Sequence, residues 1–251
     1  YKVIMAHYFI TGVSSGIGAA LVDSLATTGH RISGVARRKN RLDDLASSFS
    51  SFHPFSADVS DTAAMERAVN SALEHHGPID VAILNAGIYI PQDGTRILAK
   101  AYDEHMAVNY MGVVNALAPI IPDMIKRQQG QIAIVSSVAG WRGLPKSAAY
   151  GPTKAALISL AESLYFDLTP QGIKLQVICP GFVESEATAV NDFEMPDLIS
   201  PEIAASHIIS GLDKDQFSID FPKSFTRKMA FLRLVPDRLY FRLVGKQTGA
   251  L

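Results

Sequence analysis

The stretch HYFITGVSSGIGAALVDSLATT, residues 7–28, decides the fold of this chain. Its first residues, His7–Thr11, form a short apolar run that predicts a buried strand. Residues 17–28 have the apolar spacing of a helix, and Gly29 is placed to end it. The glycines of the turn follow the spacing G-x-x-x-G-x-G. A strand, a glycine-rich turn and a helix in this order predict the opening unit of an α/β protein.

The rest of the chain repeats this alternation of short apolar runs and longer helical patterns. Further strands are expected at residues 31–36, 52–57, 81–84, 131–135 and 174–179. Further helices are expected at about residues 40–49, 62–76, 102–127 and 149–168. Strict alternation implies right-handed crossovers and a parallel sheet that is covered on both faces. We therefore predict an α/β doubly wound, Rossmann-like fold, with one domain over residues 1–222 and a C-terminal tail over residues 223–251.

Composition excludes several classes of function. The chain has 251 residues, 48% of them hydrophobic, and a formal net charge of -1, which gives no overall field to attract nucleic acid. One cysteine, Cys179, rules out an internal disulfide, and no residues have the spacing of metal ligands. The first ten residues do not resemble a signal peptide, and no uninterrupted apolar run reaches the length of a membrane span. We expect a cytoplasmic protein without a metal.

The glycine turn and the end of the second strand indicate a dinucleotide site. Glycines let the backbone approach a pyrophosphate, which the start of the following helix attracts through its free N–H groups. The second strand ends at Ala36 and is followed by Arg37 and Arg38, where NAD-binding proteins usually place an acidic residue. Two cations here suit the 2′-phosphate of NADP and favour it over NAD. The alternative is that both arginines only form a solvated helix start.

Three residues further along favour acid–base chemistry. Ser137 follows the fifth strand, at the edge of the sheet where α/β proteins bind ligands. Tyr150 and Lys154 lie four residues apart and therefore share one helix face. A tyrosine is a poor base at neutral pH, but a nearby cation favours its phenolate. This arrangement predicts a phenol that gives and takes a proton.

With these residues in place, the chain resembles the short-chain dehydrogenase/reductase family over about residues 6–221. The matching motifs, in order, are TGVSSGIG at 11–18, DV at 58–59, NAG at 85–87, NYMG around Asn109, IVSS at 134–137, YGPTK at 150–154 and PGFVES at 180–185. The resemblance implies an NADP(H)-dependent oxidoreductase that interconverts an alcohol and a ketone or aldehyde.

The resemblance also implies four catalytic residues. Tyr150 is the expected general acid in reduction and general base in oxidation. Lys154 is expected to hold the ribose hydroxyls of the nicotinamide half and to lower the pKa of Tyr150. Ser137 is expected to hydrogen-bond the substrate oxygen, and Asn109 to hold a water that links Lys154 to solvent. The proton path then runs from solvent to the phenol.

The remaining implied residues bind the cofactor. They are expected to contact the phosphates, the adenine, the ribose and the nicotinamide face of the cofactor. Together with Tyr150 and Lys154, the set comprises Gly12, Ser14, Ser15, Gly16, Ile17, Gly18, Arg37, Arg38, Asp58, Val59, Asn85, Ala86, Gly87, Pro180, Gly181, Val183 and Ser185. Family members often have threonine where this chain has Ser185, and serine keeps the hydroxyl. The long helices at 102–127 and 149–168 form the association surface in the proteins it resembles, which implies a homodimer or homotetramer.

Two other functions use the same features. One is a non-enzymatic NADP(H) sensor or scaffold, which broken catalytic residues would favour, whereas the four residues are intact. The other is an epimerase or lyase, whose extended substrate domain this length does not offer. Trp141 has two interpretations, as a wall of the substrate pocket or as simple packing, and we expect His75 and His76 only to end a helix.

Two segments near the C-terminus bear on the substrate. Residues of about 184–200 have little periodicity and are expected to fold over the substrate as a loop, with a slight preference for apolar or amphipathic molecules. The tail from Lys223 has many cations and only one acid, Asp237. Its apolar residues recur every three or four positions, which predicts an amphipathic helix broken near Pro236. Packing on its own domain or a neighbouring subunit is favoured over peripheral membrane contact through residues 223–246.

Overall fold

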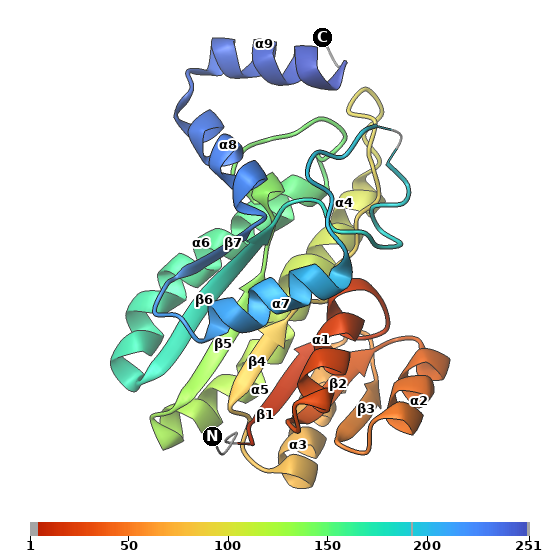
Figure 1. Cartoon of the computed structure of the whole chain (residues 1–251), viewed down its shortest axis with the longest axis vertical. Coiled ribbons are helices and arrows are strands. Elements are labelled where there is room, and N and C mark those ends of the chain that lie inside the picture. The colour runs from red at the N-terminus through yellow and green to blue at the C-terminus, as the bar shows by residue number, and fades with distance from the viewer. Residues whose placement is uncertain (1–4, 192, 250–251) are drawn as a thin grey trace.

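The computed structural model describes residues 5–191 and 193–249, so residues 1–4 and 250–251, at the two ends of the predicted domain and tail, lie outside it. In the described residues, parallel strands form one sheet in the order β3-β2-β1-β4-β5-β6-β7 (Figure 1). Their bounds are β1 His7–Thr11, β2 Arg31–Ala36, β3 Phe52–Ser56, β4 Val81–Leu84, β5 Gly130–Val135, β6 Ile173–Pro180 and β7 Ser218–Phe221. The prediction of a doubly wound, single-domain α/β fold is confirmed.

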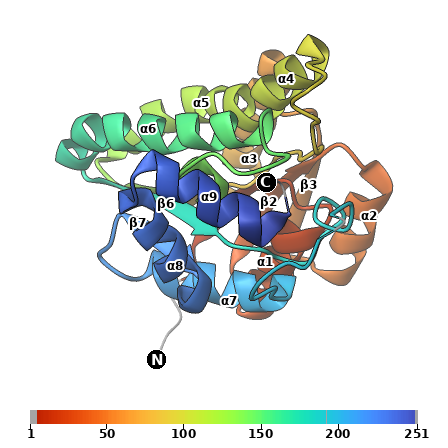
Figure 2. The same cartoon turned by 90° about the horizontal axis from the view of Figure 1, so that it is seen from above.

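Helices cover both faces of the sheet and enclose two apolar cores (Figure 2). On one face lie α1 (Gly16–Thr27), α2 (Lys39–Ser48) and α7 (Pro201–Leu212). On the other face lie α3 (Thr62–His76), α5 (Gly112–Arg127) and α6 (Tyr150–Leu168). The strands are buried on both sides because helices pack on both sides, which explains their continuous apolar runs.

The predicted helix over residues 102–127 is interrupted in the structure. It comprises α4 (Ala99–His105), a π-helical segment η1 (Met106–Met111) and α5. A π-helical turn widens the helix locally, and such turns are frequent at functional sites. Helix α7 and strand β7, in contrast, were not among the predicted elements. The other predicted strands and helices are present, with ends that agree to within a few residues.

One continuous helical stretch in the described residues, Ala99–Arg127, is long and apolar enough to cross a membrane. This stretch was not found from the sequence because it contains no single uninterrupted apolar run of that length. Only the average hydropathy of the stretch meets the criterion for a membrane span. Its residues Val113, Leu117 and Met124 are buried in the core against the sheet. This packing is that of a core helix in a globular fold.

The glycine turn after β1 is fixed by close packing on the loop after β4. Gly12 has a φ of 76°, and a Cβ on it would lie 2.8 Å from Cα of Ala86. A Cβ on Gly18 would lie 2.2 Å from the carbonyl oxygen of Gly12. The side-chain amide of Asn85 donates to the carbonyl oxygens of Thr11 (3.1 Å) and Gly12 (3.3 Å). The two loops therefore hold one another where the strand order reverses, which is where such sheets bind ligands.

The last two helices, α8 (Lys223–Leu234) and α9 (Asp237–Thr248), extend beyond the carboxyl ends of the strands (Figure 1). We call residues 223–249 the C-terminal arm. The predicted break near Pro236 is present, and the arm packs on its own domain. Arg142 donates to the carbonyl oxygens of Leu232 (2.7 Å) and Val235 (2.6 Å). The hydroxyl of Tyr240 donates to the carbonyl oxygen of Gly143 at 2.6 Å.

Four histidine rings gather at the opposite end of the sheet from the arm. His53 stacks on His75 at a centroid distance of 3.8 Å, and the ring of His76 lies 5.2 Å from that of His7. His7 donates through Nδ1 to the carbonyl oxygen of Gly77 (2.9 Å), and its Nε2 lies 2.9 Å from the Ser33 hydroxyl, from which a neutral ring accepts a hydrogen bond. His75 and His76 do end α3, as expected, but they also pack on two further histidines.

We expect this histidine cluster to make the protein less stable in mild acid. Burial, with the neighbouring histidines and Arg31, lowers the pKa of His76 from 6.5 to about 4, and burial also lowers the pKa of His7 and His53. The unfolded chain then binds protons more readily than the folded one, so the free energy of unfolding falls as the pH drops from about 6.5 to about 4. Urea denaturation near pH 7 and near pH 5 measures this fall. The fall in the free energy of unfolding should be smaller in His76→Gln. It should be unchanged in His207→Gln, because His207 lies outside the cluster. An equal fall in all three proteins contradicts the assignment.

Candidate active site

A large cleft lies at the carboxyl ends of the strands, with a volume of about 1810 Å³. The glycine turn, the ends of β2, β4, β5 and β6, the start of α6 and the C-terminal arm all line it. Every predicted site residue lines this cleft except Gly18 and Asn109. Gly18 lies behind the turn, against Gly12, and Asn109 is fully buried behind the cleft wall. The structure therefore brings the predicted residues together at one site.

The start of α1 is open to an anion. Its N-cap residue, Ser15, makes no side-chain hydrogen bond to the first turn, and that turn contains no acidic residue. A helix start of this kind leaves backbone N–H groups free and carries a partial positive charge. A Cβ on Gly16 would meet only the side chain of Ser185, at 3.5 Å, so the turn is not filled by its neighbours.

Arg38 lies across this helix start. Its guanidinium donates to the hydroxyls of Ser14 (3.1 Å and 3.0 Å) and Ser15 (2.7 Å). On its other side a single guanidinium nitrogen, Nη1, forms an ion pair with both carboxylate oxygens of Glu186, at 2.9 Å and 2.7 Å. Glu186 belongs to the loop after β6, so this pair connects that loop to the glycine turn after β1. Sequence reasoning missed Glu186, because 148 residues separate it from Arg38.

Arg37 and Asp58 form a second polar pair at the same end. The guanidinium of Arg37 lies 3.6 Å from the carboxylate of Asp58; the Arg37 side chain is largely exposed and the Asp58 side chain is partly buried. Asp58 also accepts from the backbone (2.9 Å) and the hydroxyl (2.7 Å) of Ser60. Burial raises the pKa of Asp58, but these hydrogen bonds and Arg37 outweigh it and leave the pKa below its ordinary value. Asp58 is therefore a fixed carboxylate beside Val59 on the cleft wall.

The start of α6 is attached directly to the end of β5. The ammonium of Lys154 donates to the carbonyl oxygen of Val135 at 2.9 Å. The hydroxyl of Ser136 donates to the backbone carbonyl oxygen of Lys154 at 2.8 Å. A Cβ on Gly140 would lie 2.6 Å from the backbone of Lys154, so only glycine fits there. These contacts place Tyr150, in the first turn of α6, beside Ser137, which follows β5.

Tyr150 and Ser137 are hydrogen-bonded through their side chains. The ring of Tyr89 packs edge-on to that of Tyr150 at 5.1 Å, and the Lys154 ammonium lies 5.5 Å from the Tyr150 ring centroid. Tyr89, which sequence reasoning did not identify, follows the Asn85-Ala86-Gly87 motif by two residues. That spacing after a cleft-forming motif is the signal that would have located it.

The pKa of Tyr150 differs from the expectation. Lys154 was expected to lower it, but burial raises it to about 12, although the hydrogen bond with Ser137 acts in the opposite direction. Burial also lowers the pKa of Lys154 itself to about 8. The reason is that both groups lie out of water, and desolvation disfavours the charged form of each. The folded chain alone therefore keeps Tyr150 protonated at neutral pH.

Asn109 lies in the π-helical segment and acts on the cleft wall from behind. Its side chain accepts from the backbone N–H of Ile88 (2.7 Å) and donates to the carbonyl oxygen of Ile88 (3.0 Å) and the hydroxyl of Thr153 (3.1 Å). It thus links the loop after β4 to the first turn of α6. A Cβ on Gly87 would lie 3.3 Å from Asn109 and 3.5 Å from the Lys154 ammonium, so this loop passes close to both.

The segment after β6 forms the remaining wall. Gly181 donates to the carbonyl oxygen of Phe221 at 2.7 Å, and Val183 pairs with Ile199 in a single bridge. The hydroxyl of Ser185 lies 3.1 Å from that of Thr188, within the loop. These contacts hold Pro180, Gly181, Val183 and Ser185 along the cleft.

Trp141, which the sequence left open, and Cys179 both have defined surroundings in the structure. Trp141 packs against both the core and the arm, and it is not among the described residues that line the cleft. Cys179 is 1% exposed, and burial raises its pKa to about 12, so it behaves as a small apolar residue. The arm supplies cleft residues that the sequence did not indicate, among them Phe225, Met229, Leu232 and Val244.

Comparison with known proteins places this site in a family. The sequence profile of the short chain dehydrogenases matches residues 6–195. An uncharacterized oxidoreductase of Myxococcus xanthus is 31% identical over 235 residues, which cover 92% of this chain and 93% of that protein. A dehydrogenase/reductase SDR family protein 7-like of Anopheles gambiae is 28% identical and covers 96% of this chain and 83% of its own.

Solved structures show the same fold. A short-chain dehydrogenase of Burkholderia cenocepacia in complex with NADP has a TM-score of 0.84, with 23% identity over 96% of this chain and 98% of that one. A short-chain dehydrogenase of Streptomyces avermitilis has a TM-score of 0.81, with 22% identity over 97% and 98% of the two chains. The chain therefore belongs to the short-chain dehydrogenase/reductase family of NAD(P)-dependent oxidoreductases.

Proposed function

We propose that this oxidoreductase uses NADP(H) to interconvert an alcohol and a ketone or aldehyde, with Tyr150 as the general acid and base. The observation that carries the proposal is the group formed by Ser137, Tyr150 and Lys154 on one wall of the cleft. The hydroxyls of Ser137 and Tyr150 are hydrogen-bonded to each other, so a substrate oxygen that meets one also meets the other. The proposed catalytic domain comprises residues 1–222, with the predicted tail of residues 223–251 appended to it.

The cleft fits a dinucleotide that carries a 2′-phosphate. The uncapped start of α1 suits a pyrophosphate. Two arginines follow β2, and Arg38 already binds an oxyanion, the carboxylate of Glu186, through one of its guanidinium nitrogens. The NADP complex of the Burkholderia cenocepacia relative supports this choice. The cofactor-facing roles proposed for the remaining residues, from Gly12 to Ser185, are supported by their places along the same cleft, except for Gly18, which lies behind the glycine turn against Gly12.

The chain's own residues supply the proton chemistry. NADPH, when bound, supplies the hydride. Ser137 holds the carbonyl oxygen and polarises it, and Tyr150 transfers its phenolic proton to that oxygen. The high pKa keeps Tyr150 protonated before the reaction, and the nearby Lys154 ammonium and the Ser137 hydroxyl stabilise the phenolate that remains. Asn109 fixes the first turn of α6 through Thr153, and we propose that it holds the water that returns the proton.

The alternative of a cofactor sensor or scaffold has less support, because all four proposed catalytic residues are in place. The loop over residues 184–200, tied to Arg38 through Glu186, is proposed to close over the substrate. A homodimer or homotetramer, a cytoplasmic location and peripheral membrane contact through residues 223–246 stay predictions.

Tyr150→Phe tests the proposed acid. The substitution keeps the ring and its packing on Tyr89 but removes the proton donor, so kcat for carbonyl reduction should fall by about 10²–10⁴-fold. NADPH oxidation across a panel of ketones and aldehydes measures the loss, and NADPH binding measured by fluorescence should remain. Tyr165→Phe, on an exposed part of the same helix, is the matched control. Undiminished turnover in Tyr150→Phe overturns the mechanism.

The pH profile tests the role of Lys154. Burial lowers its pKa to about 8, so the free enzyme loses this positive charge as the pH rises through about 8. We expect kcat/KM for NADPH to fall above that pH, because kcat/KM reports groups of the free enzyme. A profile that stays level up to about pH 10 contradicts the assignment.

The preference for NADPH tests the two arginines. Removing a charge-assisted pair costs about 1.5–3 kcal/mol, so Arg37→Gln and Arg38→Gln should each reduce the preference for NADPH over NADH by about ten- to hundredfold. The ratio of kcat/KM for the two cofactors is the measurement. Arg41→Gln, exposed on α2 and away from the cleft, should leave the ratio unchanged. Equal use of both cofactors by the unaltered protein refutes the proposed preference.

A further inference from the structure

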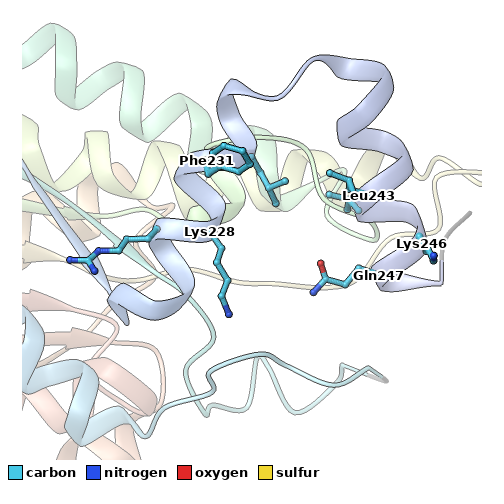
Figure 3. Close-up of a pocket in the computed structure, with 8 residues that line it drawn as sticks. Lys228, Phe231, Leu243, Lys246 and Gln247 are labelled. Carbon is cyan, nitrogen blue, oxygen red and sulfur yellow. The ribbon is translucent and has the colours of Figure 1, made fainter.

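The C-terminal arm contains a second cavity that the proposed chemistry does not use. It has a volume of about 770 Å³ and lies between α8 and α9. Ligand cavities in proteins span about 300–1,000 Å³, so the space suffices for a small organic molecule. Figure 3 shows Phe231 of α8 and Leu243 of α9 at the gap between the helices, with Lys228 and Gln247 along one edge. We call this space the arm groove.

The arm groove adjoins the cleft. Leu232, Val244 and Gln247 line both the arm groove and the cleft that contains Tyr150. Of the groove's apolar residues, Phe231 is 67% exposed and Leu243 is 44% exposed, although both are large apolar side chains. The groove therefore lies next to the cleft and presents apolar surface that water now meets.

The charges around the arm groove have one sign. Arg227 and Lys228 lie on α8 and Lys246 on α9, and all three line the groove. No carboxylate is among the described residues that line it. Asp237, the one acid of the arm, is paired with Arg142 outside the groove. An apolar floor with a cationic rim is complementary to an apolar chain that ends in an anion.

We propose that the arm groove binds the far end of the substrate, and that the substrates are aldehydes or ketones, and the matching alcohols, with a long apolar chain that ends in an anionic group. This proposal rests on the proposed function. The carbonyl lies at Ser137 and Tyr150, the chain passes Leu232 and Val244, and the anion lies at Arg227, Lys228 and Lys246. In reduction, the carbonyl carbon gains a hydride from NADPH and the oxygen gains a proton, giving the alcohol and NADP⁺.

A series of ω-oxo carboxylic acids, from the butanoic to the hexadecanoic member, tests the proposal in the full chain with NADPH. Each methylene that becomes buried should raise kcat/KM by about two- to fourfold, until the groove is filled. The long acids should exceed their methyl esters by about tenfold, because the esters lack the charge that two or three partly exposed cations attract. Equal kcat/KM for acids and esters, or no dependence on chain length, overturns the proposal.

Variants separate the arm groove from the catalytic group. The double variant Arg227→Gln/Lys246→Gln should lose the preference for acids over esters and keep its rate with short neutral aldehydes. The double variant Arg238→Gln/Arg242→Gln removes the same amount of charge from the arm, outside the groove, and should keep the preference. Loss of the preference in both double variants overturns the proposal, because a general field of the arm would then be responsible.

Direct binding distinguishes failure of this inference from failure of the proposed function. Calorimetric titration with laurate needs no turnover, and we expect binding that weakens about tenfold in Arg227→Gln/Lys246→Gln. If no carbonyl is reduced while laurate binds in this way, the proposed function fails and the groove remains an amphiphile site. If short aldehydes are reduced but laurate does not bind, the inference fails alone. Binding to phosphatidylglycerol vesicles without binding of monomeric laurate, or a dimer that Phe231→Ser dissociates with no change in laurate binding, also overturns it.

Discussion

The attachment of α6 to the end of β5 is the interaction on which the site depends. The Lys154 ammonium bonds to Val135, and the Ser136 hydroxyl bonds back to Lys154, so strand and helix hold one another at the cleft. Because Tyr150 lies one turn before Lys154, the same contacts fix the phenol beside Ser137. A buried lysine costs free energy, and the lowered pKa of Lys154 records that cost. The fold retains this costly buried charge at the proposed site of acid–base chemistry.

Much of this arrangement was predictable from sequence, for physical reasons that differ between elements. Strands buried on both faces are continuous apolar runs, so β1, β2 and β4 were located with correct bounds. The glycine turn was recognisable because Gly12 and Gly18 lie where any side chain would collide with backbone or with Asn85. Ser137, Tyr150 and Lys154 were identified by residue type and spacing, and the structure brings them together. Their roles toward cofactor and substrate stay proposals.

The missed features depend on contacts or on weak local signals. Helix α7 begins with a Ser200 cap and Pro201, a signal that was present, but β7 is a four-residue edge strand with little pattern of its own. The π-helical segment was not predicted because the helical spacing of apolar residues continues through it without a break. Glu186 contacts Arg38 only once the loop after β6 is folded. The raised pKa of Tyr150 depends on burial, which cannot be read from the residues around it in the sequence. The cluster of His7, His53, His75 and His76 likewise exists only once β1, β3 and α3 are packed.

The cleft at the carboxyl ends of the strands brings the proposed cofactor and substrate residues together. One end of it offers an uncapped helix and arginines to a dinucleotide, the middle holds a phenol and a serine hydroxyl, and the arm closes the far side. The most direct measurement is a crystal structure of the NADPH complex. The account predicts the nicotinamide ring beside the hydroxyls of Ser137 and Tyr150, with room for a carbonyl carbon about 3–3.5 Å from the ring, and the 2′-phosphate on Arg37 or Arg38. A nicotinamide bound elsewhere, or a Tyr150 side chain turned away from it, would contradict the account.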